Sequence, residues 1–260
     1  MFVRNEDFRS FLRHYPLVSI IIAINLIIFL AVNLLPSPIG RPGGTITTFM
    51  VEWHGGIEQG QYWRLITPIF LHIGFSHVLF NSFWTVLFAP ALERILGKWK
   101  FVVAYLGTGI IGNIATYYLL DPRTLSFGAS GAIFGLFGIY IYMVLFRKDL
   151  IDRPSSSIVI WIAVFAVITT FFTQGVNIVA HLFGLIGGLL LGPPLLSRVP
   201  QNFSWQPSVI KPRKHYQDTE VTFNPNRWRK RKKRNDLGKK IIWGLFALFI
   251  LLGIVSMFFR

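Results

Sequence analysis

The sequence predicts an all-α protein that crosses a membrane several times. Hydrophobic residues make up 53% of its 260 residues and charged residues only 14%, against roughly 25% charged residues in an average soluble domain. Seven stretches are apolar over about the 20 residues that a helix needs to cross a bilayer. They cover residues 17–35, 69–91, 101–120, 128–146, 157–174, 176–196 and 241–258. We therefore expect these seven stretches, in order, to be membrane helices.

Positive charge is distributed unevenly between these stretches. Lys and Arg are enriched in the cytoplasmic loops of membrane proteins. If the N-terminus is cytoplasmic, the inside segments carry 22 of the 26 Lys and Arg residues; these segments are 1–16, 93–100, 147–156 and 197–240. The sequence therefore predicts a cytoplasmic N-terminus and an extracellular C-terminus.

Two of the connections are unusual. Residues 197–240 contain 13 Lys and Arg against 3 Asp and Glu, and we interpret them as a mostly disordered basic cytoplasmic linker. Anionic lipid headgroups are its expected partner, and nucleic acid is not expected. The first external connection, about 36–68, mixes aromatic and polar residues and is expected to lie in the membrane interface.

Polar side chains inside apolar spans are costly, and they mark candidate functional positions. The second span contains His72, His77 and Asn81, the fourth contains Ser130 and the sixth contains His181. At 1.5 Å per residue, Ser130, His181 and His77 lie about 22–24 Å above the cytoplasmic ends of their spans. Asn81 lies about 18 Å above its own. Three spans thus bring polar groups to one level, somewhat below the outer surface.

Close helix packing alone would explain some of the small and polar residues in the spans. Gly131 and Gly135 form a small-xxx-small pair, as do Gly184 and Gly188. Asparagine side chains in a span often only hydrogen-bond a neighbouring helix. We expect this role for Asn25, Asn33 and Asn113.

The residues at the common level suit acyl transfer. A serine hydroxyl needs a base to become a good nucleophile, and His181 lies at the matching depth. No Asp or Glu occurs near that level within a span, so we expect a Ser–His dyad and not a triad. The chain has no cysteine, and His72 and His77 have no accompanying carboxylate. We therefore expect neither a metal site nor a cofactor.

An acyl transfer also needs donors for the developing oxyanion. His77 and Asn81 are one helical turn apart and project from one face. The backbone N–H of Ser130, in the first turn of its helix, has no partner within that helix. Gly128 and Gly131 allow other backbone to approach the nucleophile. These donors are expected to converge on one oxygen.

Four motifs together resemble the rhomboid intramembrane serine proteases. They are "WR" at 63–64, "HIGFSHVLFN" at 72–81, "GASGAIFG" at 128–135 and "AHLFGLIGG" at 180–188. The resemblance implies a six-helix core over residues 17–196, with 241–258 added as a seventh helix. It also implies that the nucleophile lies at the outer-leaflet end of a short fourth helix.

The resemblance also implies roles for individual residues. Ser130 would be the nucleophile and His181 the base, and the Ser130 N–H, His77 and Asn81 would form the oxyanion hole. His72 resembles an additional histidine of the family that is structural or lines a water-retention site. Trp63 and Arg64 would shape the external loop. Gly184 belongs to the sixth-span motif. Phe134 stands where relatives often have a tyrosine packed on the catalytic histidine, and it lacks the hydroxyl.

The expected activity is therefore that of a serine endopeptidase that cleaves transmembrane proteins. By resemblance, its location is a bacterial plasma membrane. One alternative is a catalytically inactive relative that binds membrane proteins, but such relatives usually lack the serine or the histidine. Another is a channel or transporter, for which we would expect charged sites or internal repeats. The sequence shows neither.

Overall fold

The computed structural model describes residue 2 and residues 6–201. Their helical elements are α1 (Phe8–His14), α2 (Pro16–Leu34), α3 (Thr45–Met50), α4 (His54–Glu58), η1 (Tyr62–Leu65), η2 (Thr67–Phe70), α5 (Phe75–Leu96), α6 (Lys98–Leu119), α7 (Ser130–Phe146), η3 (Lys148–Leu150), α8 (Arg153–Phe172) and α9 (Ile178–Leu196). Strand pairing within the described residues is limited to one isolated antiparallel bridge, Glu52 with Ser126. The prediction of an all-α protein is confirmed.

Five of the described helices are long and apolar enough to cross a membrane, namely α2, α5, α6, α8 and α9. The apolar helix α7 is shorter, with 17 residues. These six helices correspond in order to the first six predicted spans. The linker beyond residue 201 and the predicted span 241–258 lie outside the described residues.

The second span begins later than the sequence predicts. Helix α5 starts at Phe75, after Gly74, whose φ of 89° is incompatible with a right-handed helix. Residues 67–70 form the separate short helix η2. His72 consequently lies in the segment that leads into α5, and its predicted place inside the second span is wrong.

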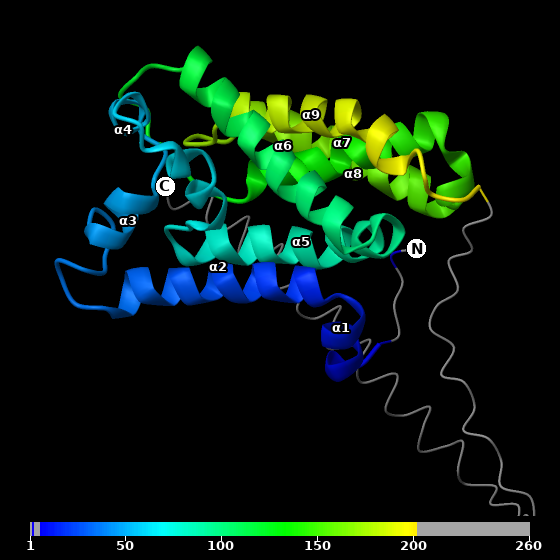
Figure 1. Cartoon of the computed structure of the whole chain (residues 1–260), viewed down its shortest axis with the longest axis horizontal. Helices are drawn as coiled ribbons and strands as arrows, with labels where there is room; N and C mark the ends of the chain where they lie inside the picture. Colours follow the sequence, from blue (N-terminus) through cyan, green and yellow to red (C-terminus); the bar gives the residue numbers. More distant parts are fainter. Residues whose placement is uncertain (1, 3–5, 202–260) are drawn as a thin grey trace, which may run out of the picture. The chain divides into compact units, whose positions relative to one another are not determined.

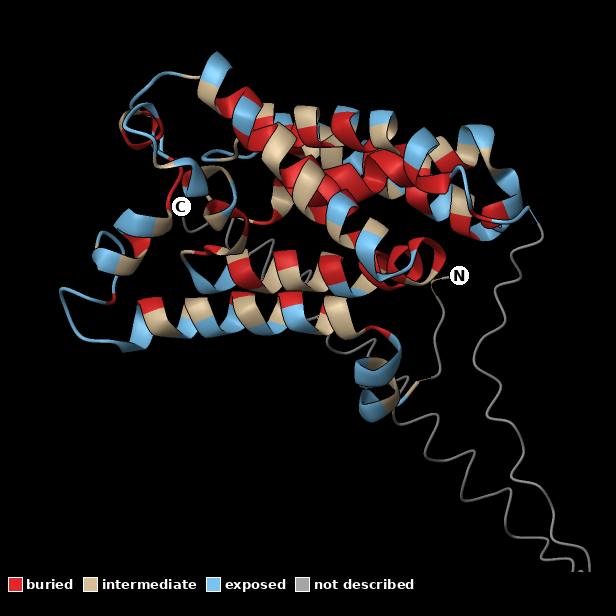
Figure 2. Ribbon diagram, in the orientation of Figure 1, coloured by how far each residue is buried: buried red, intermediate tan, exposed pale blue. Residues whose placement is uncertain are grey.

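Helix α7 packs against α9 and α6, and glycines allow the close approach (Figure 1). A Cβ atom added at Gly184 would overlap the carbonyl oxygen of Gly131, and one added at Gly188 would overlap that of Gly135. One added at Gly135 would overlap the Thr108 side chain of α6. The backbones of α7 and α9 are therefore in direct contact, and most residues of α7 are buried (Figure 2).

Helices α2 and α5 form a second pair, joined by a charged cap (Figure 1). The Glu93 carboxylate of α5 accepts hydrogen bonds from the backbone N–H groups of Leu17 and Val18, each at 2.9 Å. These are among the donors that a helix N-terminus leaves without an internal partner. The Tyr140 hydroxyl of α7 donates to the carbonyl of Phe88 at 2.6 Å and connects α5 with α7.

Many large apolar residues of α2 and α8 are exposed, and α2 is coloured mostly as exposed or intermediate along its length (Figure 2). On α8, Trp161 is 74% exposed and Phe172 is 82% exposed. So many exposed large apolar residues on single helices are unusual in a soluble monomer. They form the surface that a membrane helix turns toward lipid, and the chain is an integral multi-pass membrane protein.

The connection between α2 and α5 folds around one buried arginine. Arg64 donates to the Gln61 side chain at 2.6 Å and to the carbonyls of Thr48 and Val51 at 2.6 and 2.9 Å. The neighbouring Trp63 stacks on Phe49, with ring centroids 5.3 Å apart. These contacts support the expected role of Trp63 and Arg64 in shaping this loop.

Candidate active site

Ser130 is the first residue of α7. The segment before it is held in place by contacts of Gly128 with Pro68 and His77. Gly128 has a φ of 119°, and its N–H donates to the carbonyl of Pro68 at 2.8 Å. A Cβ at Gly128 would lie 2.6 Å from Nε2 of His77. Both the backbone angle and this close approach require glycine. The N–H of Ser130 has no carbonyl partner within the helix, and it lies at the positive end of the helix dipole.

His181 is buried in the first turn of α9. The Asn177 side chain caps this helix, since its Oδ1 accepts from the Ala180 N–H at 2.9 Å. The same side chain donates through Nδ2 to Thr116 of α6 at 2.9 Å and to Ser126 at 2.8 Å. One side chain thus connects the start of α9 to α6 and to the segment that leads into Ser130.

Ring stacking and glycine contacts bring the starts of α7 and α9 together. Phe134, one turn after Ser130, stacks on His181 with ring centroids 4.1 Å apart and an interplanar angle of 16°. A Cβ at Gly131 would lie 3.3 Å from the carbonyl oxygen of Ala180. The predicted pair, Ser130 and His181, therefore lies on neighbouring first turns. On its other edge, Nδ1 of His181 lies 2.9 Å from the Thr170 hydroxyl of α8.

Two histidines lie beside the segment that leads into Ser130. His77, in the first turn of α5, adjoins Gly128, and its ring centroid lies 5.7 Å from that of Phe127. The His72 ring is 5.0 Å from that of His77, and its Nε2 accepts from the N–H of Ala129 at 3.3 Å. His72 therefore reaches the site from outside α5.

Asn81 is buried one turn further along α5 than His77. Its Nδ2 donates to the carbonyl of His77 at 2.9 Å, and its own carbonyl accepts from the Thr85 hydroxyl. One of the two Nδ2 protons is enough for the first bond. The amide of Asn81 thus keeps a second proton for another acceptor.

The arrangement suits acid–base and nucleophilic chemistry. Across residues 6–201 and residue 2, no group of three or more His, Cys, Asp or Glu side chains is placed to hold a metal ion. The polar groups near Ser130 are imidazoles, amides and hydroxyls. Such groups transfer protons and donate hydrogen bonds to a developing negative charge.

Three further residues at or near the site escape the sequence motifs. Asn177 has a recognisable signal, because an asparagine before an apolar run is a typical N-cap. Thr170 has none, since hydroxyl side chains are common in membrane helices.

Glu52 is fully buried and paired with Ser126 through the backbone. Burial raises the pKa of Glu52 to about 8, which the nearby Ser126 side chain offsets only in part.

Comparison with known proteins finds a family model that covers the site positions from residue 59 onward. The model of the rhomboid domain matches residues 59–198. "Putative rhomboid protease YdcA" of Bacillus subtilis (strain 168) is 48% identical over 191 residues, covering 74% of this chain and 94% of that protein. Rhomboid protease GluP of the same strain is 37% identical over 153 residues, 58% of this chain and 29% of GluP. Rhomboid-like protease 1 of Toxoplasma gondii is 31% identical over 188 residues, 69% of this chain and 64% of that protein.

Proposed function

The chain belongs to the rhomboid family of intramembrane serine proteases, and we propose that Ser130 and His181 are its catalytic dyad. The observation that carries this proposal is the stacking of Phe134 on His181. Phe134 and Ser130 are four residues apart on α7 and share one helix face. Holding the imidazole against Phe134 therefore holds it beside the serine. The aromatic face is sufficient for this contact, so the absence of a tyrosine hydroxyl leaves the dyad intact.

In the proposed reaction, Ser130 Oγ attacks the carbonyl carbon of the scissile peptide bond. Nε2 of His181 takes the hydroxyl proton and then gives it to the leaving amine, which yields an acyl-enzyme. A water molecule, deprotonated by the same nitrogen, hydrolyses the ester and restores Ser130. The cycle needs no carboxylate as a reacting group.

The negative charge of each tetrahedral intermediate requires hydrogen-bond donors. The N–H of Ser130, at the start of α7, is the first proposed donor. His77 lies against Gly128, and Asn81 is one turn further along the same helix. We assign these three to the oxyanion hole. The hydrogen bond from Ala129 to His72 supports a structural role for His72.

A transmembrane helix that unwinds locally is the proposed substrate. In a formed helix each carbonyl accepts a hydrogen bond from four residues on, so attack needs a break, which Gly or Pro favours. Gly128 and Gly131 flank Ser130 in the chain, and the bulky Phe134 lies one turn further along α7. By resemblance to the family, a small residue such as alanine is expected just before the scissile bond.

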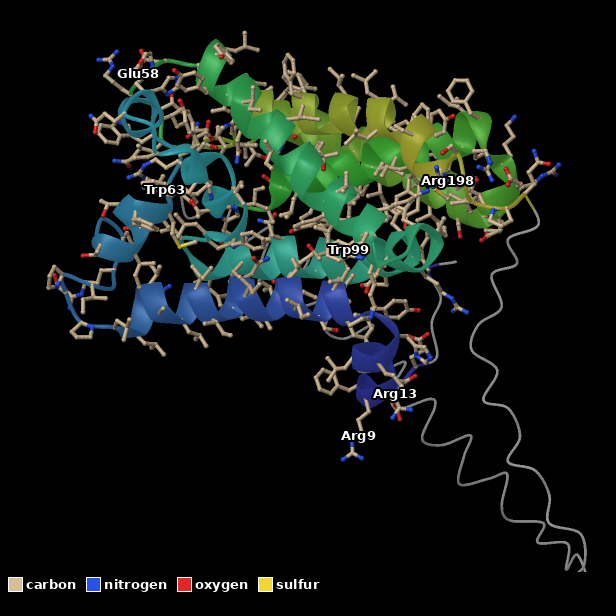
Figure 3. All side chains as sticks on the ribbon, in the orientation of Figure 1. Arg9, Arg13, Glu58, Trp63, Trp99 and Arg198 are labelled. Carbon is tan, nitrogen blue, oxygen red and sulfur yellow. The ribbon has the colours of Figure 1, made fainter. Side chains whose placement is uncertain are left out.

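Charge supports an orientation with the active site toward the outside. Arg9, Arg13 and Arg198 lie at the opposite end of the bundle from Trp63 and Glu58 (Figure 3). Positive charge marks the cytoplasmic side, so the N-terminus would be cytoplasmic. We extend this to a bacterial plasma membrane, with the basic segment 197–240 on anionic lipid headgroups.

The dyad is tested with Ser130→Ala and His181→Ala on purified protein and a model transmembrane substrate. Each substitution should abolish cleavage. A fluorophosphonate probe should label Ser130 in the wild type and should label neither variant. Ser157→Ala, which removes an exposed hydroxyl at the start of α8, is the matched control and should cleave normally. Cleavage by either dyad variant, with the fold intact, would contradict the assignment.

A further inference from the structure

The imidazole of His181 has a second nitrogen that the proposed dyad does not use. Two tautomers of a neutral histidine exist, and only the one protonated at Nδ1 leaves a lone pair on Nε2 for the serine proton. In Ser–His–Asp enzymes a carboxylate selects this tautomer. The group that meets Nδ1 of His181 is the hydroxyl of Thr170, at 2.9 Å.

Thr170 is buried in the last turn of α8. Its hydroxyl lies 2.8 Å from the carbonyl oxygen of Ala166, to which it donates. A threonine hydroxyl has one proton to donate and two lone pairs that accept. With its proton given to Ala166, the oxygen is left as an acceptor toward His181.

The two tautomers of His181 differ in the number of hydrogen bonds that they allow at Thr170. If Nδ1 carries a proton, it donates to Thr170 while Thr170 donates to Ala166, and both bonds form. If Nδ1 is bare, the single threonine proton serves either His181 or Ala166, and one bond is lost. The carbonyl of Ala166 also accepts from the Thr169 hydroxyl at 3.0 Å, so it stays paired in either arrangement. The first arrangement still forms one more hydrogen bond among buried groups, and each such bond is stabilising. It is therefore the favoured one.

We propose that Thr170 is the positioning residue of His181, which keeps the proton on Nδ1 and the lone pair of Nε2 toward Ser130. This inference rests on the proposed function, since it gives the dyad a third member. The threonine oxygen also accepts from Nδ1 after His181 has taken the serine proton. Being neutral, it stabilises the imidazolium less than a carboxylate would. Phe134 fixes the plane of the ring, and Thr170 fixes its rotation within that plane.

The chain offers a matched control one residue away. Thr169 also donates its hydroxyl to the carbonyl of Ala166, at 3.0 Å, but His181 is hydrogen-bonded by Thr170. Thr170→Val keeps the shape and removes the hydroxyl, whereas Thr170→Ser keeps the hydroxyl. Thr169→Val removes a hydroxyl bonded to the same carbonyl.

The experiment measures kcat and KM for a transmembrane substrate, with the rate of fluorophosphonate labelling and the thermal stability of each variant. Thr170→Val should lower kcat and the labelling rate about 10- to 100-fold, as expected for an unpaired buried N–H, with KM within about twofold of the wild type. Thr170→Ser should restore kcat to within about threefold, and Thr169→Val should match the wild type. A Thr170→Val enzyme with unchanged kcat, or a Thr170→Ser enzyme as impaired as Thr170→Val, would overturn the inference.

Nitrogen-15 NMR of the wild type, with labelled histidine side chains, provides a test that does not depend on a variant folding. The signal absent from His181→Gln identifies His181, and its shifts should be those of the tautomer protonated at Nδ1. Protonation at Nε2 would overturn the inference. Failure of the dyad itself has a separate signature, because Ser130→Ala would then cleave substrate while the tautomer stayed as described.

Discussion

The two regions that meet at Ser130 are held together by different kinds of contact. Between α7 and α9, backbone meets backbone through glycines such as Gly131 and Gly184. In the loop between α2 and α5, order comes from side chains that bond to backbone, as Arg64 does with Thr48 and Val51. The first region is therefore sensitive to added volume. The second is sensitive to the loss or gain of charge and hydrogen bonds.

The geometry of the site depends on both kinds of contact. Steric contact sets the distance from Ser130 to α9. Polar contacts set the path of the chain into Ser130, through the Gly128 bond to Pro68 and the backbone bridge from Ser126 to Glu52.

The largest effect is expected from Gly184→Ala. The added methyl group overlaps the carbonyl oxygen of Gly131, so α7 and α9 must separate. A displacement of about 1 Å at a catalytic site costs about 100-fold in rate, and overpacking of this kind lowers the free energy of unfolding by about 3 kcal/mol. Cleavage rates and thermal stability in detergent measure both.

Gly107→Ala is the control for this substitution. Its Cβ would meet only the tip of the Leu191 side chain, at an ordinary 3.5 Å. It should leave cleavage unchanged and stability equal or slightly higher, because alanine favours a helix over glycine. Equal behaviour of the two variants would show that α7 and α9 are less closely packed than described.

An intermediate effect is expected at Asn177, which joins the two regions. Asn177→Ala loses the helix cap and both bonds from Nδ2, which should cost about 1–2 kcal/mol of stability and about tenfold in cleavage. Asn177→Asp keeps the cap oxygen but cannot donate to Thr116 and Ser126. It should recover most of the stability and little of the cleavage rate. Full recovery of cleavage would assign Asn177 to helix capping alone.

The smallest effect on cleavage is expected at Glu52, where the readout is stability against pH. Its pKa rises from 4.5 to about 8 on burial, so the folded state retains a proton that the unfolded state has lost. The contribution of Glu52 to stability is therefore fully present below pH 4.5 and is lost as the pH rises toward 8. Above pH 8 it changes no further. The midpoint of thermal unfolding should be several degrees lower at pH 9 than at pH 5.

Glu52→Gln should remove this pH dependence, because the amide does not ionise. Glu58→Gln, at an exposed position of the same loop, should keep the wild-type profile. A Glu52→Gln protein that loses stability with pH as steeply as the wild type would place the titrating group elsewhere.

The membrane helices could be predicted from the sequence because each is a long apolar run whose signal is local. The proposed site residues could be named from the sequence because they lie in short motifs around His77, Ser130 and His181, and their roles stay predictions. The start of α5 could not, since the break at Gly74 lies inside an apolar stretch. The contacts of Thr170 and the burial of Glu52 depend on segments that are distant along the chain, so no local pattern reveals them.

The glycines of α7 and α9 also limit how the protein can recover from mutation. A clash between two side chains is relieved when a second substitution shortens the partner. At Gly184 and Gly188 the obstructing atoms are the carbonyl oxygens of Gly131 and Gly135, and every amino acid has that oxygen. No second substitution on α7 removes the obstacle. A search for suppressors of Gly184→Ala should therefore return only revertants at position 184 or changes that tilt a whole helix.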